Sequence, residues 1–126
     1  MRVLLSIKPE FANKIFEGLK RYEYRKVSFK NKDVKTVLVY STQPVGQIIG
    51  EFDILEILSD HPTELWETTQ DGAGIDSAFY DQYFEGRDQA VAIKIGETRL
   101  YDTPKDPNEM FERFVAPQSF RYLAAE

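Results

Sequence analysis

The chain of 126 residues contains no cysteine, which excludes disulfide bonds and thiolate chemistry. It has a single histidine, His61, which precedes Pro62 and has no second candidate ligand near it in the sequence. Metal-ligand clusters, glycine-rich phosphate loops and nucleophile elbows are also missing from the sequence. We therefore predict neither a metal site nor a cofactor.

Long hydrophobic runs are missing as well. The apolar run of residues 3–7 is broken by Ser6 and is too short for a signal peptide, and no stretch approaches the length of a membrane span. We expect a cytoplasmic protein that does not enter a membrane. The hydrophobic content of 42% and the aromatic content of 13% are typical of a globular chain, so residues 1–126 are predicted to form one domain with its own core.

Basic residues are outnumbered, and the net charge of −5 argues at first against a nucleic-acid partner. The charges are unevenly distributed, however. Residues 1–37 carry ten Lys/Arg against four Asp/Glu, a net charge of +6, whereas residues 38–126 carry six against seventeen, a net charge of −11. This asymmetry favours a local basic face. The alternative is that these charges are simply solvated and scattered over the surface.

Hydrophobic periodicity predicts alternating strands and helices. The expected strands are residues 2–7, 21–29, 36–41, 47–58 and 89–95, with residues 99–101 extending the sheet after a turn at Gly96. The expected helices begin at Pro9, at Pro62, after a cap at Asp76 or Ser77, and at Asn108, the last one running to Phe114. The apolar tail of residues 116–123 should pack back on the body. Together with a bend expected at Gly50, this pattern predicts an α+β fold, a small and partly open β-barrel flanked by helices.

An aromatic stripe occurs at helical spacing in the third predicted helix. It consists of Phe79, Tyr80, Tyr83 and Phe84. Aromatic residues on one helix face most often pack into a core, so we assign the stripe to the core.

Three charged residues lie close together in the segment from Gly18 to Arg25, where the first helix runs into the second strand. Side chains alternate along a strand, so Glu23 and Arg25 should point the same way, about 7 Å apart. Lys20 lies in the preceding turn and can fold toward them. A carboxylate between two cations stays ionised and can help to bind an anion or a polar ligand. The alternative is a surface ion pair that contributes little to stability.

Three further residues are candidates to lie near this cluster. Lys8 occupies the cap position of the first helix, where lysine cannot accept the free amide hydrogens, so an anion site is one interpretation and an exposed lysine is the other. Ser41 and Thr42 end a strand beside Pro44 and could line a cleft, although such hydroxyls often bond only to their own turn.

These residues resemble a known family, the ASCH domain of the PUA-like β-barrel superfamily. Its G-x-K-x-x-E-x-R signature is matched at every fixed position by Gly18, Lys20, Glu23 and Arg25. The lead-in of residues 4–9 and the segments 40–42 and 50–52 are similar too, and the likeness covers nearly the whole chain.

The resemblance implies a barrel with a cleft that binds RNA or a nucleoside. Lys20, Glu23 and Arg25 would line this cleft, with Lys8, Ser41 and Thr42 as neighbours. Some small bacterial members are amidohydrolases that remove the acetyl group from N4-acetylcytidine by means of a threonine nucleophile. This chain resembles them but has Glu23 at that position, and glutamate cannot act as a hydroxyl nucleophile.

Three hypotheses follow for the cluster. The first is an RNA- or nucleotide-binding module in which cations contact phosphate, Glu23 accepts from a base amino group and a tyrosine stacks. The second is an enzyme, either a hydrolase of a modified nucleoside or a ribonuclease, with Glu23 as general base and Lys20 or Arg25 stabilising negative charge. The third is a structural cluster that closes the barrel.

Overall fold

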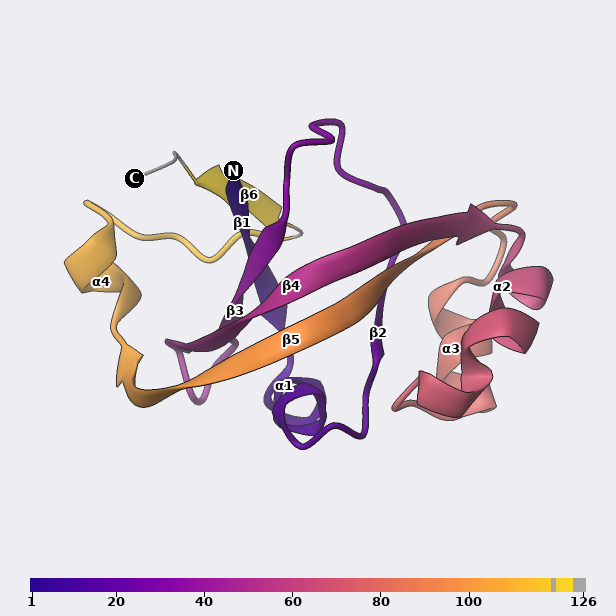
Figure 1. Cartoon of the computed structure of the whole chain (residues 1–126), viewed down its shortest axis with the longest axis horizontal. Helices are drawn as coiled ribbons and strands as arrows, with labels where there is room; N and C mark the ends of the chain where they lie inside the picture. The colour runs from indigo at the N-terminus through magenta and orange to yellow at the C-terminus, as the bar shows by residue number, and fades with distance from the viewer. Residues whose placement is uncertain (119, 124–126) are drawn as a thin grey trace.

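The fold is described by a computed structural model that covers residues 1–118 and 120–123 (Figure 1). The strands are β1 (Arg2–Ile7), β2 (Tyr22–Arg25), β3 (Thr36–Ser41), β4 (Gln47–Asp60), β5 (Ala90–Lys105) and β6 (Phe120–Leu123). The helices are α1 (Pro9–Phe16), α2 (Pro62–Thr69), the 3₁₀ turn η1 (Gln70–Gly72), α3 (Ser77–Tyr83) and α4 (Pro107–Met110).

All six strands belong to one mixed sheet, in the order β2-β5-β4-β3-β1-β6. β1 and β3 are parallel, and the other neighbouring strands are antiparallel. β4 and β5 form a long hairpin that crosses the molecule and curves the sheet into a half-barrel (Figure 1). Pairing is irregular beside Gly50, where a bend was predicted. The predicted α+β class and the partly open barrel with flanking helices are therefore confirmed.

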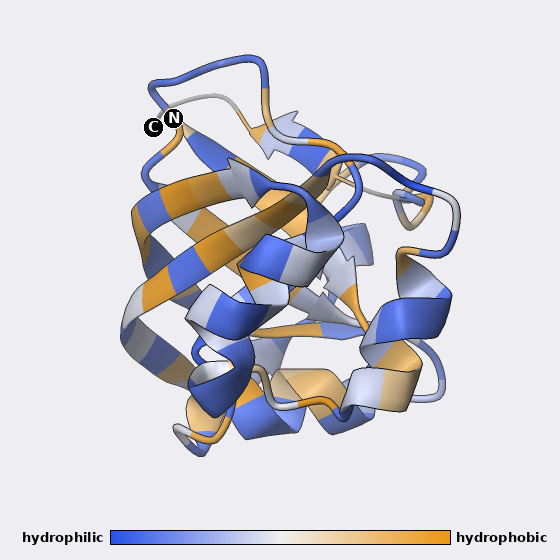
Figure 2. Ribbon diagram, turned by 90° about the vertical axis from the view of Figure 1, so that its right-hand side faces the viewer, coloured by the Kyte–Doolittle hydropathy of each residue, from blue (hydrophilic) through white to orange (hydrophobic). Residues whose placement is uncertain are grey.

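The inside of the half-barrel is filled by apolar side chains from β1, β3, β4 and β5 together with α1. Val3, Leu5, Val37 and Val39 are completely buried there, because β1 and β3 are covered on both faces. Hydrophobic and hydrophilic residues alternate along the long strands, as expected for strands with one buried face (Figure 2).

The α2–η1–α3 segment connects β4 to β5 and covers the end of the hairpin (Figure 1). Its Leu65, Tyr80 and Phe84 pack with Tyr24 of β2 in a second apolar cluster. Of the two predicted caps, Asp76 is the one that caps α3, by accepting a hydrogen bond from the amide of Phe79. This packing places α3 beside β2, which is where the charged segment begins.

Three element boundaries differ from the prediction. β2 ends at Arg25 rather than near residue 29, because its partner β5 begins only at Ala90 and residues beyond Arg25 have no strand to pair with. β5 continues through Gly96 without a turn, because irregular pairing with β4 absorbs the bend. α4 ends at Met110 rather than at Phe114, because Phe111 adopts an extended conformation.

The tail returns to the body as expected. β6 pairs antiparallel with β1, and Leu123 is buried. Residue 119, which belongs to the predicted tail, lies outside the described residues. Within residues 1–118 and 120–123, none of the helices has the length and apolar character needed to cross a membrane.

Candidate functional site

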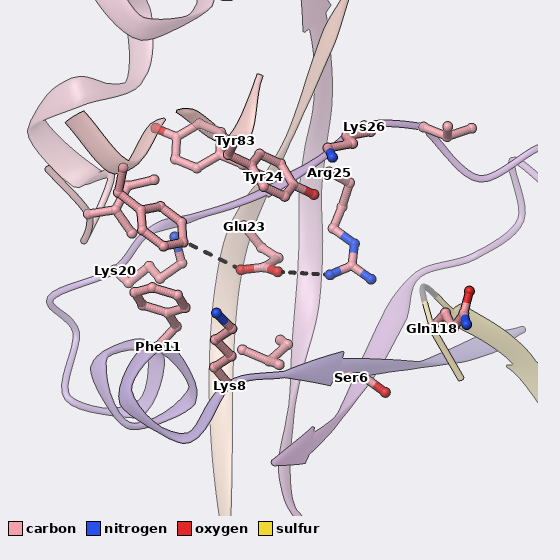
Figure 3. A pocket seen from close by; sticks show the side chains of 14 residues that line it. Ser6, Lys8, Phe11, Lys20, Glu23, Tyr24, Arg25, Lys26, Tyr83 and Gln118 are labelled. Carbon is pink, nitrogen blue, oxygen red and sulfur yellow. Dashed lines mark hydrogen bonds and ion pairs between the residues drawn. The ribbon is translucent and has the colours of Figure 1, made fainter. Parts of the chain in front are cut away.

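A pocket of about 520 Å³ opens between β1 and β2, in the gap that the half-barrel leaves between β2 and β6 (Figure 3). Its volume lies in the range of small-molecule and cofactor sites. The lining residues come from the end of β1, from α1, from β2 and the residues after it, from α3 and from the segment before β6. They are Ser6, Ile7, Lys8, Phe11, Lys20, Glu23, Tyr24, Arg25, Lys26, Val27, Ile75, Phe79, Tyr83 and Gln118.

The three charged residues of the motif lie together in this pocket (Figure 3). The Glu23 carboxylate accepts a hydrogen bond at 3.2 Å from Arg25 Nη1, and its other oxygen lies 3.9 Å from Lys20 Nζ. The side chains of Lys20, Glu23 and Arg25 are only 2%, 8% and 12% exposed. The alternative of a surface ion pair is therefore wrong.

Lys20 is held in place by the segment between η1 and α3. Its ammonium group donates a hydrogen bond of 2.8 Å to the carbonyl of Ala73, and Lys14 donates one of 3.1 Å to the carbonyl of Gly74. Gly74 has a φ of +69°, and a Cβ at this position would approach Lys20 Cβ to 2.5 Å. Only glycine allows the backbone to come this close to the lysine.

The surroundings of Lys20 act on its charge in opposite directions. Burial lowers the pKa of the Lys20 ammonium, the negative charge of Glu23 opposes this shift, and the positive charge of Lys14 adds to it, so that the pKa lies below its ordinary value. The rings of Tyr24 and Phe11 lie 5.0 Å and 5.7 Å from Lys20 Nζ and present their faces to the cation. The net result is a buried cation that is costly to charge, a common property of functional groups.

Aromatic side chains form the walls of the pocket. Phe11 of α1 and Phe79 of α3 meet edge to face with their ring centres 5.2 Å apart, and Tyr83 lies on the same helix as Phe79. Two lysines lie over these rings: Lys8 Nζ is 5.8 Å from the centre of Phe79, and Lys26 Nζ is 4.8 Å from the centre of Tyr83. The pocket thus combines flat apolar surfaces with cations.

Four of the six predicted site residues come together here, namely Lys8, Lys20, Glu23 and Arg25. Ser41 and Thr42 are not among the lining residues. Ser41 is buried at the end of β3, which lies on the side of β1 away from the gap, and the backbone amide of Thr42 donates to the carbonyl of Ile7. Lys8 begins α1 without a capping side chain, as predicted.

The aromatic residues that form the walls of the pocket were not predicted as site residues. Phe79 and Tyr83 were assigned to the core with the rest of the aromatic stripe, but only Tyr80 and Phe84 are buried there. The width of the aromatic stripe could have indicated this. The stripe covers more than half of a two-turn helix, and only one face of a helix can be buried in the core. Gln118 carried no signal of its own.

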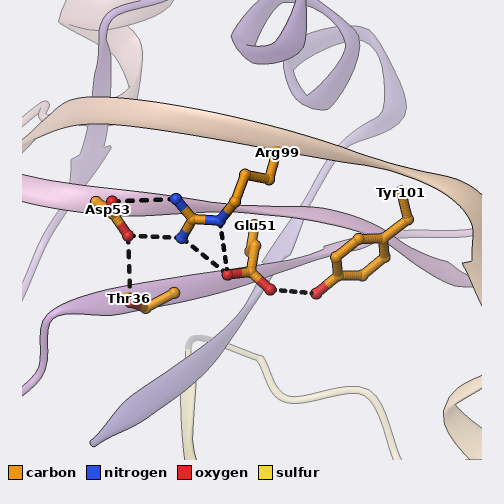
Figure 4. Close-up of polar contacts among 5 residues, drawn as sticks. All are labelled: Thr36, Glu51, Asp53, Arg99 and Tyr101. Atoms are coloured by element: carbon orange, nitrogen blue, oxygen red, sulfur yellow. Dashed lines mark hydrogen bonds and ion pairs between the residues drawn. The ribbon is translucent and has the colours of Figure 1, made fainter.

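A second polar cluster lies on the β4–β5 hairpin and involves five residues that the motif does not include (Figure 4). Arg99 of β5 lies opposite Glu51 of β4 and donates hydrogen bonds of 2.8 and 3.0 Å to Glu51 Oε2. It also donates bonds of 2.6 and 3.1 Å to the two carboxylate oxygens of Asp53. Tyr101 donates to Glu51 and Thr36 donates to Asp53.

This Arg99 cluster is much more exposed than the pocket cluster, with 38% of Arg99 and 42% of Asp53 accessible. Its hydrogen bonds lower two carboxyl pKa values. For Glu51, burial opposes the shift, but the bonds from Arg99 and Tyr101 outweigh it. For Asp53, the bonds from Arg99 dominate. Both carboxylates are therefore favoured in the charged form.

Among the described residues, no group of three or more His, Asp or Glu side chains is arranged to hold a metal ion. The side chains that line the pocket supply ammonium, guanidinium, carboxylate, hydroxyl, amide and aromatic groups.

The chain is similar in sequence and in fold to proteins of known structure. The chain is 28% identical over 126 residues to a curated protein of Zymomonas mobilis named "ASCH domain-containing ribonuclease", covering 98% of this chain and 84% of the relative. The crystal structure of ASCH from Zymomonas mobilis matches with a TM-score of 0.91 at 27% identity, covering 98% of this chain and 87% of that one.

A more distant structure, the N-terminal domain of Staphylothermus marinus McrB, shares the fold with a TM-score of 0.54 at 13% identity and covers 90% of this chain and 80% of that one. The chain is also 32% identical over 122 residues to the large ribosomal subunit protein uL22 of Ureaplasma parvum. That match covers 96% of this chain but only 39% of the relative, so the chain spans about two fifths of its length.

The description of the matching family model, which covers residues 5–99, is the ASCH domain. This span is more than half of the chain and includes the whole Gly18–Arg25 motif. The chain therefore belongs to the ASCH domain family.

Proposed function

We propose that this ASCH domain binds single-stranded RNA by taking one nucleotide into the pocket between β1 and β2. The observation that carries the proposal is the buried Lys20–Glu23–Arg25 cluster, which lies in a pocket with aromatic walls. Single-stranded RNA is recognised by stacking unstacked bases on aromatic side chains and by hydrogen bonds to their edges.

The two halves of a nucleotide find matching groups in the pocket. Phe11, Phe79 and Tyr83 offer flat surfaces for a base, and the Glu23 carboxylate offers acceptors for its amino or imino hydrogens. Lys8 and Lys26 lie beside the rings of Phe79 and Tyr83 and provide charge for phosphate.

The segment after β2 favours a strand over a free nucleoside. Residues 26–35 carry four lysines and one aspartate, and all four lysines are exposed. The segment starts in the pocket lining at Lys26 and is held near its middle, where the hydroxyl of Tyr122 accepts hydrogen bonds from the amides of Lys30 and Asn31. An ordered basic segment leading from a pocket fits the phosphates of neighbouring nucleotides.

The acidic remainder of the chain does not oppose this arrangement. The net charge of −11 belongs to residues 38–126, whereas the lysines of the pocket and of the 26–35 segment belong to the basic first third. Affinity depends on the phosphates that are contacted, and the surrounding acidic surface discourages other modes of binding. The relative from Zymomonas mobilis is named a ribonuclease, which is in keeping with RNA as the class of partner.

The direct test measures fluorescence anisotropy of a labelled single-stranded RNA with the wild type, Arg25→Ala and Arg99→Ala. Arg25→Ala should weaken binding about tenfold because it removes a pocket cation, and Arg99→Ala, which removes the same side chain outside the pocket, should bind like the wild type. Binding should weaken steeply with salt, and Lys30→Gln with Lys32→Gln should lower the salt slope by about 2. Undetectable binding at low salt would overturn the proposal.

One observation favours a second candidate function, RNA cleavage or hydrolysis of a modified nucleoside. Burial lowers the pKa of Lys20, and a lysine with a lowered pKa beside a carboxylate can take part in proton transfer. Glu23 would act as general base on a water molecule or a ribose hydroxyl, and Arg25 would stabilise the developing negative charge.

Product formation tests this second candidate. RNA oligonucleotides and a panel of acylated nucleosides that includes N4-acetylcytidine are incubated with the wild type and with Glu23→Gln. Turnover that Glu23→Gln abolishes would assign a catalytic role to the cluster. Tight RNA binding without any turnover would leave a binding module, and loss of stability without any effect on a ligand would leave a structural cluster.

A further inference from the structure

The three charged groups of the pocket lie in a row. Figure 3 shows Lys20, the Glu23 carboxylate and the Arg25 guanidinium following one another across the pocket. Along this row, the donor groups of Lys20 and Arg25 lie on either side of the two oxygens of the Glu23 carboxylate. One oxygen faces Lys20 Nζ at 3.9 Å, and the other accepts from Arg25 Nη1 at 3.2 Å.

The carboxylate has capacity left for a ligand. The distance between Lys20 Nζ and Glu23 Oε1 is too long for a hydrogen bond, so that oxygen can accept one from the pocket. The oxygen bonded to Arg25 can accept a second bond, because each carboxylate oxygen has two acceptor positions. A ligand with two adjacent N–H donors would use both oxygens at once.

Among the four RNA bases, guanine alone has two such donors side by side. Its edge runs from the acceptor O6 through the donors N1–H and N2–H to the acceptor N3, which is the complement of the donor, two oxygens and donor in the pocket. Adenine and cytosine each place a ring acceptor next to their single amino group, and uracil has one imino donor between two carbonyl groups. Each of these three bases would set a lone pair against the carboxylate.

We infer that the pocket is specific for guanine, with Glu23 accepting from N1–H and N2–H and with Lys20 and Arg25 at the two ends of the base edge. The inference rests on the proposed function, since it names the base that the RNA-binding pocket selects. Phe11, Phe79 and Tyr83 would bind any base through its face, so Glu23 is the residue that sets the preference.

The test uses five-nucleotide RNAs with abasic sugars at four positions and a single central base. Guanine, hypoxanthine, adenine, cytosine and uracil are compared, with guanosine 5′-monophosphate as a further ligand. Guanine should bind best. Hypoxanthine differs only in lacking the N2 amino group and should bind about tenfold more weakly, the effect of one hydrogen bond to a charged group. Tighter binding of the guanine pentamer than of the mononucleotide identifies RNA as the source of the base.

A variant assigns the preference to its residue. In Glu23→Gln one acceptor becomes a donor, so the difference between guanine and hypoxanthine should fall below about threefold. Glu51→Gln, the same change outside the pocket, should preserve the tenfold difference. The comparison of the two purines in the wild type needs no variant and remains decisive if Glu23→Gln does not fold.

The outcomes separate this inference from the proposed function. Equal binding of all five bases, or a preference for another base, overturns guanine specificity and leaves RNA binding intact. Absence of binding to every pentamer overturns both. If guanosine 5′-monophosphate binds as tightly as the pentamer, guanine specificity stands and RNA as the partner is overturned.

Discussion

Two of the arginines in the part of the chain that the structure describes, Arg25 and Arg99, lie in polar clusters that differ in almost every physical respect. The Arg99 cluster is exposed and tightly bonded, with donor–acceptor distances of 2.6 to 3.1 Å to Glu51 and Asp53. The pocket cluster is buried and looser, with a separation of 3.9 Å on its lysine side. The Arg99 cluster, which has the shorter hydrogen bonds, is therefore the one exposed to water.

A ligand is expected at the buried cluster rather than at the exposed one. The Arg99 donors are already used by two carboxylates, and Tyr101 and Thr36 complete the set, so little capacity remains for a partner. In the pocket, the charged groups of Lys20, Glu23 and Arg25 are buried at a cost in free energy, and there is space beside them for another polar group. What distinguishes the candidate site is a buried carboxylate that lies 3.9 Å from its lysine neighbour. Variants in the two clusters test this contrast.

The largest effect is expected from removing the central carboxylate of the buried cluster. Glu23→Ala leaves the Lys20 ammonium buried without its counter-charge and should lower the free energy of unfolding by about 3 kcal/mol at neutral pH. Glu51→Ala, the matching change in the exposed cluster, should cost about 1 kcal/mol because water replaces the lost contacts. Urea denaturation measures both. Equal losses would remove the distinction between the two clusters.

The next effect concerns the support that only the buried cluster has. Gly74→Ala places a methyl group against Lys20 at a φ of +69° and should cost about 2 to 3 kcal/mol. Gly86→Ala is the control, since Gly86 has a φ of +77° with nothing within 4 Å of an added Cβ, and it should cost about 1 kcal/mol. Thermal or urea unfolding compares the two variants. A loss at position 74 no larger than at position 86 would show that Lys20 does not need this backbone.

The alkaline side of the stability profile should report on Lys20. Its pKa is lowered in the folded protein, mainly by burial, so the folded state releases the proton at a lower pH than the unfolded state. The stability of the wild type relative to Lys20→Met should therefore rise as the pH increases from the folded pKa toward the ordinary lysine value. Denaturation from pH 7 to pH 10 checks this. A constant difference would indicate that Lys20 titrates normally.

Stability at acid pH should report on the exposed cluster, where it again rises with pH and where the effect is the smallest. The pKa values of Glu51 and Asp53 are lowered in the folded state, so their contribution is present above the ordinary carboxyl range and is lost as the pH falls through their folded pKa values. The stability advantage over Arg99→Met should be below about 1 kcal/mol at pH 7 and should vanish near pH 2. An advantage that persists at pH 2 would mean that Arg99 acts through packing.

The motif and the fold were accessible from the sequence because both depend on local pattern. The spacing of Lys20, Glu23 and Arg25 at a helix-to-strand junction is enough to bring the three charges together. The half-barrel followed from strands of clear periodicity and from the bend at Gly50, and the uncapped Lys8 was visible in the order of residues alone.

The rest depended on the sheet order, which no local pattern contains. Ser41 and Thr42 have suitable side chains at a strand end, but β3 lies on the far side of β1 from the gap. Phe79 and Tyr83 look like core residues, because a stripe on a helix does not tell how much of it the core will cover. Ala73 contributes through its carbonyl, and a backbone group leaves no trace in the identity of a residue.

The way in which the α2–α3 segment is inserted has one more consequence. Asp60 at the end of β4 pairs directly with Ala90 at the start of β5, so residues 61–89 leave the hairpin and return to it at neighbouring positions. The sheet would therefore close without them, while one wall of the pocket is supplied entirely by Ile75, Phe79 and Tyr83. This wall is an exchangeable part: another insertion at the same junction could reshape the pocket while the charges on β2 stay on the unchanged barrel, provided that it returns a carbonyl to Lys20 and covers Tyr24.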